Sequence, residues 1–306
     1  MNLDELLADG SWRFDSPASA AFRLAPETTA RRGALVEHIL GRPEPDPELW
    51  ESILIETFLN HPAASDLQRL RVEMTDFHHS ARRAASAIAR QPRTTLTELW
   101  FGHPFRYLYE TATTSTGRGF NPLDHYDEGF VGDAGDAMWQ ALPALRTLTV
   151  EGALLFHAVS APAVTHVRSR GVISSDGSVL PGPLPTLTHF ELEIATDVFG
   201  TACPVEQLEE LSPASFPALI SLDLTRAEFD GEPLLTLADL PILPHLTSLR
   251  VGPHQLDDTA WAAIAPHFDH LSLTIARASS CRPGGARPPG AASTMTTWRR
   301  ARRSRP

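Results

Sequence analysis

The sequence predicts an α/β repeat solenoid with a helical cap over its N-terminal end, and three observations lead to this fold class. First, a phrase of the form Leu-x-x-Leu-x-Leu recurs eight times. Second, a proline lies two residues before the first apolar position in the last six copies. Third, the copies start 19–32 residues apart, with one interval of 49, as stacked repeats do. The first apolar positions are Leu67, Leu96, Leu145, Val164, Leu187, Leu219, Leu246 and Phe268.

Each copy of the phrase predicts a short strand with one buried face. In every copy except the one at Val164, the last two apolar residues are separated by one residue, so they point to the same side of an extended chain. The proline ends any helix before it and favours extended backbone. Because one unit cannot bury its own apolar face, neighbouring units have to stack into a continuous core.

A helical cap is predicted over residues 1–62. Apolar residues have helical spacing over 3–7, over 31–40 and over 48–60, the last opened by Pro47. A cap of this kind covers the core that a terminal repeat would otherwise expose.

The repeat solenoid is predicted over residues 63–276. Residues 80–90 are rich in helix-forming alanine and arginine, so the first unit is predicted as strand, helix, strand. The interval of 49 residues is predicted to contain an insertion at 102–133, which is rich in Gly, Thr and aromatic residues. Residues 134–141 predict the helix that leads to the next strand.

The segment of eight copies resembles the leucine-rich repeat proteins of the cytoplasmic, ribonuclease-inhibitor-like or bacterial kind. The longer pattern of that family continues with an asparagine or cysteine and then an apolar residue. Here the apolar place is kept at Leu155 and Phe229, but Ala153 and Ala227 stand where the asparagine or cysteine would be. The family's asparagine ladder is therefore missing, and we expect neighbouring turns to pair their backbone groups in another way.

The resemblance implies an open horseshoe with a parallel sheet on its concave side, helices or irregular turns outside, and a protein partner on the concave surface. The polar residues of each strand then point to that surface.

Arg168 and Arg170 fall beside Glu191 and Glu193, which predicts either charge pairing on a solvated sheet or a ligand patch. Trp100 would anchor such a patch, since Trp and Arg are enriched in binding hot spots. The predicted partner-binding residues are Trp100, Glu98, Thr149, Glu151, His166, Arg168, Arg170, His189, Glu191 and Glu193. The outward positions of the last three strands are predicted as Ser221, Asp223 and Thr225, Ser248, Arg250 and Gly252, and His270, Ser272 and Thr274.

Composition restricts the partners. The chain contains no lysine, and the eight arginines of 277–306 leave 18 arginines against 37 acids elsewhere, a net charge of −19. Such a body repels phosphate backbones, so we expect nucleic acid as a partner only for the tail. The chain has no run of about 18 apolar residues, no signal-peptide pattern and too few cysteines for a disulfide framework. We therefore expect no membrane partner and a cytoplasmic location.

Motifs for chemistry are sparse. Residues 124–128, Asp-His-Tyr-Asp-Glu, are the densest group of metal-capable side chains, but their spacing fits no metal loop and favours an acidic surface loop. We interpret His78 and His79 as the turn that starts a helix, and Cys203 as a buried thiol. Without a nucleophile elbow, phosphate loop or zinc cysteine pair, we predict no catalytic residue, metal or cofactor.

Residues 277–306 predict a disordered basic tail, because their Arg, Pro, Gly, Ala and Ser cannot bury enough surface to fold. Three interpretations stay open: a tail that binds nucleic acid or an acidic surface, a plain disordered end, and a frame change in a GC-rich gene. The other reading frames after codon 276 test the third, which fails if none resumes a repeat or a capping helix.

The favoured function is a non-enzymatic scaffold that binds a protein on the concave face. Two alternatives stay open. One is an enzyme or effector with its chemistry in 102–133 or in the N-terminal region, for which bound metal would be the sign. The other is a structural or regulatory domain without a discrete ligand.

Overall fold

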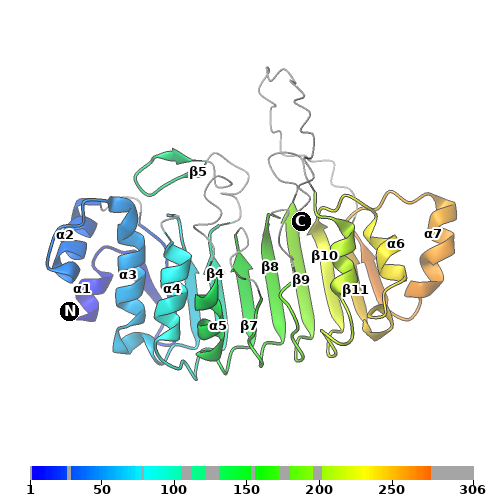
Figure 1. Cartoon of the computed structure of the whole chain (residues 1–306), viewed down its shortest axis with the longest axis horizontal. Coiled ribbons are helices and arrows are strands. Elements are labelled where there is room, and N and C mark those ends of the chain that lie inside the picture. Colours follow the sequence, from blue (N-terminus) through cyan, green and yellow to red (C-terminus); the bar gives the residue numbers. More distant parts are fainter. Residues whose placement is uncertain are drawn as a thin grey trace, which may run out of the picture. The chain divides into compact units, whose positions relative to one another are not determined.

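The computed structural model of the chain describes residues 2–25, 29–76, 79–104, 112–120, 131–152, 156, 158–172, 180–195 and 202–276. Residues 1–276 form one compact unit, built around a ten-stranded sheet in the order β1-β2-β3-β4-β7-β8-β9-β10-β11-β12 (Figure 1). The first two strands pair antiparallel and every later neighbouring pair is parallel. The chain is therefore α/β with an open, mostly parallel sheet. The predicted tail, 277–306, lies outside the described residues.

The eight strands predicted from the repeated phrase are all present and lie next to one another in chain order. They are β3 (Arg69–Glu73), β4 (Glu98–Gly102), β7 (Thr147–Glu151), β8 (His166–Val172), β9 (His189–Ala195), β10 (Ser221–Ala227), β11 (Ser248–Val251) and β12 (Ser272–Ile275). Chain order and parallel pairing follow from the strand-then-crossover unit, because each crossover returns the chain to the start of the next strand.

The leucines of the phrase form the core. In β3, β4 and β9 to β11 the two apolar residues of each strand are at most 2% exposed. The first apolar residue of each phrase, which lies before the strand, is buried to the same degree. Two places differ, since Val150 is only half-buried and Ser169 replaces an apolar residue in β8. Apart from these two places and a bulge at the end of β10, the predicted assignment of buried and exposed strand faces is confirmed for β3 to β11.

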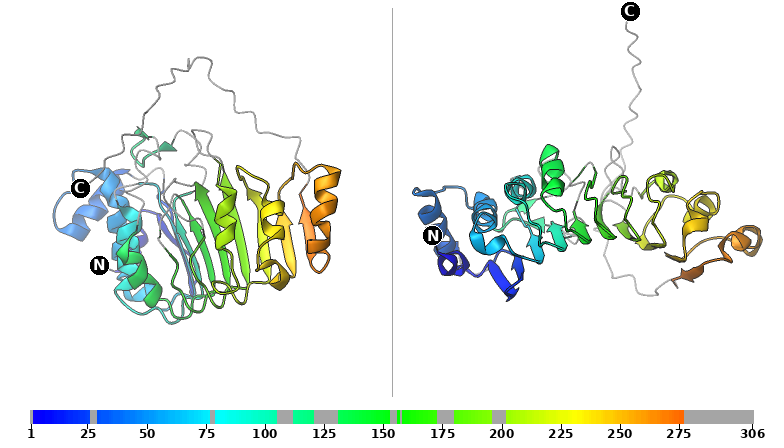
Figure 2. Two further views of the ribbon diagram at one scale, coloured as in Figure 1. Left: turned by 45° about the vertical axis from the view of Figure 1, so that its right-hand side comes forward. Right: turned by 90° about the horizontal axis from the view of Figure 1, so that it is seen from below.

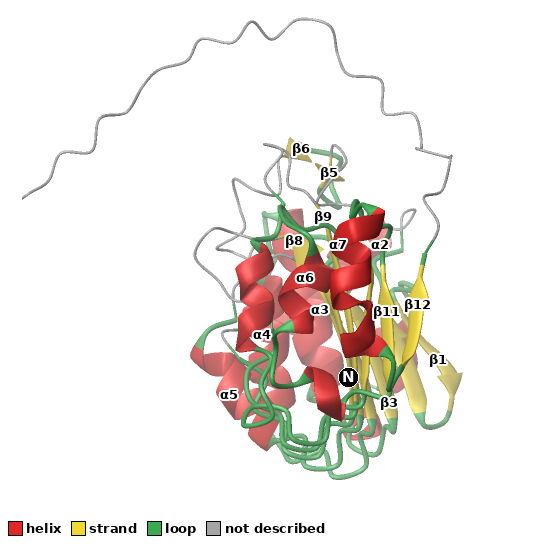
Figure 3. Cartoon of the chain, turned by 90° about the vertical axis from the view of Figure 1, so that its right-hand side faces the viewer, coloured by secondary structure: helices red, strands yellow, loops and turns green. Residues whose placement is uncertain are grey.

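The helices that follow the strands cover one face of the sheet (Figures 2 and 3). In the N-terminal half these are α3 (Trp50–Leu59), α4 (Ser80–Ala89) and α5 (Asp133–Gln140), and in the C-terminal half α6 (Pro233–Ala238) and α7 (Asp258–Ile264). Short 3₁₀ turns complete the crossovers: η1 (Pro47–Leu49), η2 (Pro62–Ala64), η5 (Val205–Glu210), η6 (Leu243–His245) and η7 (Ala265–Phe268). The opposite face of β4 to β11 carries no helix of the described part of the chain (Figure 2).

The N-terminal region is only partly as predicted. The helices α1 (Leu3–Leu7), α2 (Thr29–Leu40) and α3 are present, but the expectation of helices alone is wrong. A hairpin of β1 (Trp12–Ser16) and β2 (Ser19–Phe22) lies between them, and β2 pairs parallel with β3. The Trp12 ring stacks on Phe58 of α3 at 3.8 Å, so hairpin and helix together cover the first repeat. The run Ser19–Phe22 is buried on both faces and therefore lacks the alternation that announces a strand.

The predicted insertion is described at 112–120, where β5 (Ala112–Thr113) and β6 (Gly119–Phe120) form a small hairpin. Two buried acids fasten it to the body. Nη2 of Arg118 is 2.7 Å from Oε2 of Glu48, and the Ser115 hydroxyl donates to Asp76 at 2.6 Å. The acidic motif at 124–128 lies outside the described residues.

A backbone hydrogen-bond ladder joins neighbouring units where the strands begin. The carbonyl of the residue before each strand from β3 to β10 accepts two N–H bonds from the next unit: that of Thr165 accepts from Thr188 at 2.9 Å and from His189 at 3.0 Å. The Thr188 hydroxyl donates to the same carbonyl at 2.9 Å. The same arrangement recurs at Thr247, whose N–H and hydroxyl both reach the Ile220 carbonyl. Threonine after the first leucine thus adds a side-chain hydrogen bond between neighbouring units.

Replacing Thr188 with valine is expected to lower the free energy of unfolding by about 1 kcal/mol, because the shape is kept and one hydroxyl donor is lost. Urea unfolding followed by circular dichroism measures the loss. Thr274 is an exposed strand threonine, and its valine variant should stay within about 0.5 kcal/mol of the wild type. Equal behaviour of the two variants would show that the hydroxyl ladder adds nothing.

Candidate functional site

The uncovered sheet face presents three rows of side chains in register. The first row contains Arg69, Glu98, Thr147, His166, His189, Ser221, Ser248 and Ser272. The second contains Arg71, Trp100, Thr149, Arg168, Glu191, Asp223, Arg250 and Thr274. The third contains Glu73, Gly102, Glu151, Arg170, Glu193 and Arg226. All ten predicted site residues belong to these rows, on β4, β7, β8 and β9.

Two predicted outward positions are wrong. A bulge between Asp223 and Arg226 places Arg226, not Thr225, opposite Glu193. In β12, Ser272 pairs with Ser248, so this strand is shifted by two residues and His270 precedes it. The turn of η7 lengthens the connection before β12, which the spacing of apolar residues alone could not show.

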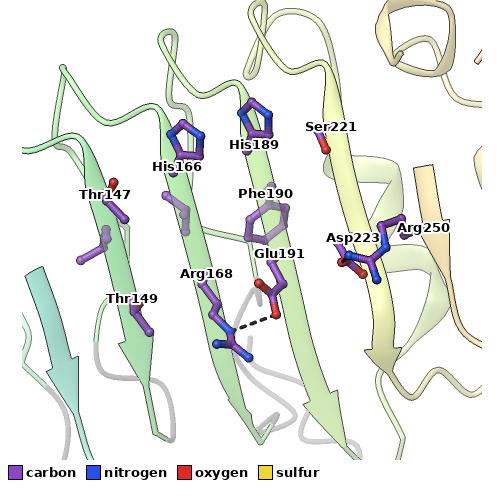
Figure 4. A pocket seen from close by; sticks show the side chains of 12 residues that line it. Thr147, Thr149, His166, Arg168, His189, Phe190, Glu191, Ser221, Asp223 and Arg250 are labelled. Carbon is purple, nitrogen blue, oxygen red and sulfur yellow. Dashed lines mark ion pairs between the residues drawn. The ribbon is translucent and has the colours of Figure 1, made fainter. Parts of the chain in front are cut away.

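The middle of the face is hollowed into a depression of about 340 Å³ across β7 to β11 (Figure 4). Five predicted residues line it: Thr149, His166, Arg168, His189 and Glu191. It is also lined by Thr147, Ser221, Asp223 and Arg250, which the predicted site did not include, and by the edges of Leu148, Val167 and Phe190. The remaining predicted residues, Glu98, Trp100, Glu151, Arg170 and Glu193, are not part of its lining.

The third row contains an ion-pair network centred on Arg170, which is half-buried between the buried acids Glu151 and Glu193. Its Nε lies 2.7 Å from Oε2 of Glu193, and its Nη1 lies 3.0 Å from Oε2 of Glu151. Burial alone would raise the pKa of Glu193. The hydrogen bond and charge of Arg170, with the charges of Arg226 and Arg168, outweigh it and hold that pKa below its ordinary value. The predicted cross-strand charge pairing is confirmed, and it makes Arg170 a structural residue.

In the second row each arginine of the depression faces an acid. Nε of Arg168 is 3.0 Å from Oε1 of Glu191, although this atom is not aligned for a hydrogen bond. Nη1 of Arg250 is 2.8 Å from Oδ2 of Asp223. Both arginines are partly exposed, so these pairs contribute little to stability and are open to exchange with a ligand.

The two histidines of the first row stack on each other, with ring centroids 4.3 Å apart and planes 7° from parallel. Nδ1 of His166 is 2.9 Å from the Thr165 hydroxyl, and Nδ1 of His189 is 2.9 Å from that of Thr188. The two hydroxyls also lie within hydrogen-bond distance of backbone carbonyls, that of Thr165 3.3 Å from the Arg146 carbonyl and that of Thr188 2.9 Å from the Thr165 carbonyl. Both histidines belong to the lining of the depression.

Burial, followed by the positive charge of His189, lowers the pKa of His166 below its ordinary value of 6.5. Replacing His189 with glutamine is expected to raise the pKa of His166, because the repulsion between two stacked imidazolium rings is removed. A proton–carbon NMR titration of the imidazole resonances measures this directly. A variant of the distant His245 serves as a control, and an unchanged His166 pKa in His189→Gln would argue against the stack.

Trp100 lies outside the depression, two strands from Arg168. The Arg71 guanidinium lies over its ring, 4.4 Å from the centroid, in a cation–π contact. Its role as an aromatic anchor for a ligand stays a prediction.

Other groups with chemical potential have structural surroundings. Both carboxylate oxygens of buried Glu51 accept backbone N–H bonds, from Thr75 and Asp76. Burial, then the charge of Asp76, raises the pKa of Glu51 well above its ordinary value. Burial and then Asp230 raise the pKa of the Cys203 thiol to about 12, which disfavours the nucleophilic thiolate.

Among the described residues, no three or more His, Cys, Asp or Glu side chains are grouped as they would be around a metal ion. Within the same residues, no helix has the length and apolar character needed to span a membrane. Comparison with models of protein families and with curated proteins finds no match for this chain. Its function has to be argued from the uncovered face.

Proposed function

We propose that the chain is a leucine-rich-repeat solenoid that binds a partner protein on the uncovered face of its sheet, without catalysing a reaction. One observation carries the proposal. From β4 to β11 the face presents polar and aromatic side chains in continuous register, while the leucines of the same strands point to the core. Side chains held on rigid strands can match a partner at little cost in conformational entropy.

The size of the face favours a protein ligand. Neighbouring strands are about 4.8 Å apart, so the eight strands from β3 to β12 extend over about 34 Å, the width of a small domain. Its three rows include Trp100 and several arginines, two residue types that are enriched in protein interfaces.

Charge argues against nucleic acid. Outside 277–306 the chain has 18 arginines against 37 acids. Within the depression, Arg168 and Arg250 are each beside a carboxylate, so no run of positive charge is offered to a phosphate backbone. With only two cysteines in the sequence, a reducing cytoplasm is the proposed location.

Comparative affinity capture from the native host tests the proposal with three baits. The first is the wild-type chain. The second carries Thr149→Tyr and Ser221→Tyr, which fill the depression without changing its charge. The third carries Ser86→Tyr on α4, on the helix-covered side. We expect a protein that is retained by the first and third baits and lost from the second.

Retention by all three baits, or loss from the third alone, would contradict binding on the sheet face. The absence of any saturable partner for the wild-type chain would instead favour a structural or regulatory domain without a discrete ligand. Circular dichroism of each bait shows that it is folded.

A further inference from the structure

The depression has a cluster of hydrogen-bond acceptors at its centre. Glu191 of β9 and Asp223 of β10 stand directly opposite each other in the parallel register. His189, two residues before Glu191 on the same strand, and His166 beside it place two stacked imidazole rings next to the acids. The donors Arg168 and Arg250 stand at the two outer sides of the acids.

The order of charges across the second row is therefore positive, negative, negative, positive. Two like charges directly opposite on neighbouring strands repel each other. Each acid uses one oxygen toward its arginine, Oε1 of Glu191 and Oδ2 of Asp223, while Oδ1 of Asp223 accepts the Thr225 N–H at 2.9 Å. The side chain of Glu191 is 39% exposed, so it can turn toward a ligand. A cation placed between the two acids would relieve their repulsion.

We propose that the depression binds the guanidinium group of an arginine side chain that the partner protein inserts between Glu191 and Asp223. This inference rests on the proposed function, because it names the partner chemistry of the same face. A guanidinium offers five N–H donors in a planar fork, enough to donate to both carboxylates. The net charge of −19 outside 277–306, from 18 arginines and 37 acids, favours the approach of a basic partner surface.

An anionic ligand fits the depression less well. It would have to displace Glu191 from Arg168 and Asp223 from Arg250, and would leave two carboxylates adjacent to itself. An arginine leaves both existing ion pairs in place.

The probe for this proposal is the capped pentapeptide Gly-Ser-Arg-Gly-Ser, with citrulline in place of arginine as a neutral control of nearly the same shape. Each peptide is titrated into the full chain while the imidazole NMR signals of His166 and His189 are followed. We expect saturable shifts of both histidines with the arginine peptide, and binding about tenfold weaker, ~1.4 kcal/mol, with the citrulline peptide.

Glu191→Gln and Asp223→Asn are each expected to weaken binding of the arginine peptide about tenfold. Glu98→Gln removes an exposed acid of the same face outside the depression and should change binding by less than about twofold. Equal binding of the two peptides, no shift of either histidine, or an equal effect of Glu98→Gln would overturn the proposal.

This failure is distinguishable from a failure of the proposed function. If the tyrosine bait loses its partner but the arginine peptide does not bind, the face is the binding surface and the arginine chemistry is wrong. If the tyrosine bait retains its partner, binding on the face itself is refuted.

Discussion

Replacing Arg170 with alanine is expected to lower the free energy of unfolding by about 3–5 kcal/mol, as breaking a buried ion pair does. The side chain bridges Glu151 and Glu193, which are 5% and 8% exposed. Without the guanidinium, both carboxylates would lose a charge partner in a row that is largely shielded from water, while Glu193 would keep its contacts with Arg168 and Arg226. Urea unfolding at neutral pH measures the change.

The pH dependence adds a second test. The folded-state pKa of Glu193 is held below its ordinary value of 4.5, so its contribution to stability is present at neutral pH and is lost as the pH falls through the folded-state pKa. The difference between wild type and Arg170→Ala should therefore shrink on acidification below about pH 4.5. A difference that grows at acidic pH would contradict the network.

Arg226→Ala is the matched control, because Arg226 approaches the same glutamate at 3.5 Å from a side chain that is 64% exposed. We expect it to cost at most about 1 kcal/mol. A loss below about 1 kcal/mol for Arg170→Ala as well would show that the row is solvated. Charge reversal at Arg170 would report on folding as well as on binding, so it is a poor test of the partner site.

Replacing Gly102 with alanine is expected to cost about 3 kcal/mol or more, because two kinds of strain combine. Gly102 has φ +142°, and a Cβ atom there would lie 1.8 Å from the carbonyl oxygen of Glu151. That oxygen belongs to the neighbouring strand β7 and accepts the N–H of His103 at 2.8 Å, so it cannot move without breaking the pairing.

Gly117→Ala separates the two kinds of strain. Gly117 also has a positive φ, +80°, but a Cβ atom there would meet nothing within 4 Å. Its alanine variant should cost only the backbone term, about 1–2 kcal/mol. Thermal unfolding of both variants gives the comparison. Equal losses would show that the close approach of β4 and β7 at Gly102 is absent in solution.

Much of the sheet could be predicted because one physical rule governs it. Leu148, Leu222 and Leu249 occupy equivalent places in their phrases, and each is completely buried. Once these residues point to the core, Thr149, Asp223 and Arg250 have to point to the other face. The three rows follow from the same alternation, which also places Arg170 directly beside Glu193 on the neighbouring strand.

The depression was only half predicted. The expected working surface extended from Trp100 to Glu193, on β4 to β9, whereas the depression lies across β7 to β11. The position of the depression depends on side-chain volumes and on which arginines form ion pairs with neighbouring acids. The alternation of apolar and polar residues along a strand gives no information on either. The histidine stack depends on threonines in neighbouring turns, and its parts are in separate repeats.

Features made by contacts between distant segments could not be predicted. Arg93 is 1% exposed and donates to the carbonyls of Ala64 and Leu59 at 2.6 Å each, which closes the end of α3. Nothing around it in the sequence distinguishes it from an exposed arginine. The hairpin of β1 and β2 was missed for a similar reason, since burial on both faces removes the alternating pattern.

Site-specific photo-crosslinking tests the central claim, binding on the uncovered face, most directly. A photoreactive phenylalanine analogue is placed at Glu98, an exposed position of the face beside the depression, and in a second variant at Ser86 on α4. Neither side chain lines the depression, so both variants should still bind. After irradiation in the native host, we expect a covalent adduct with the partner protein from position 98 and none from position 86. An adduct from position 86 with none from position 98 would contradict binding on the sheet face.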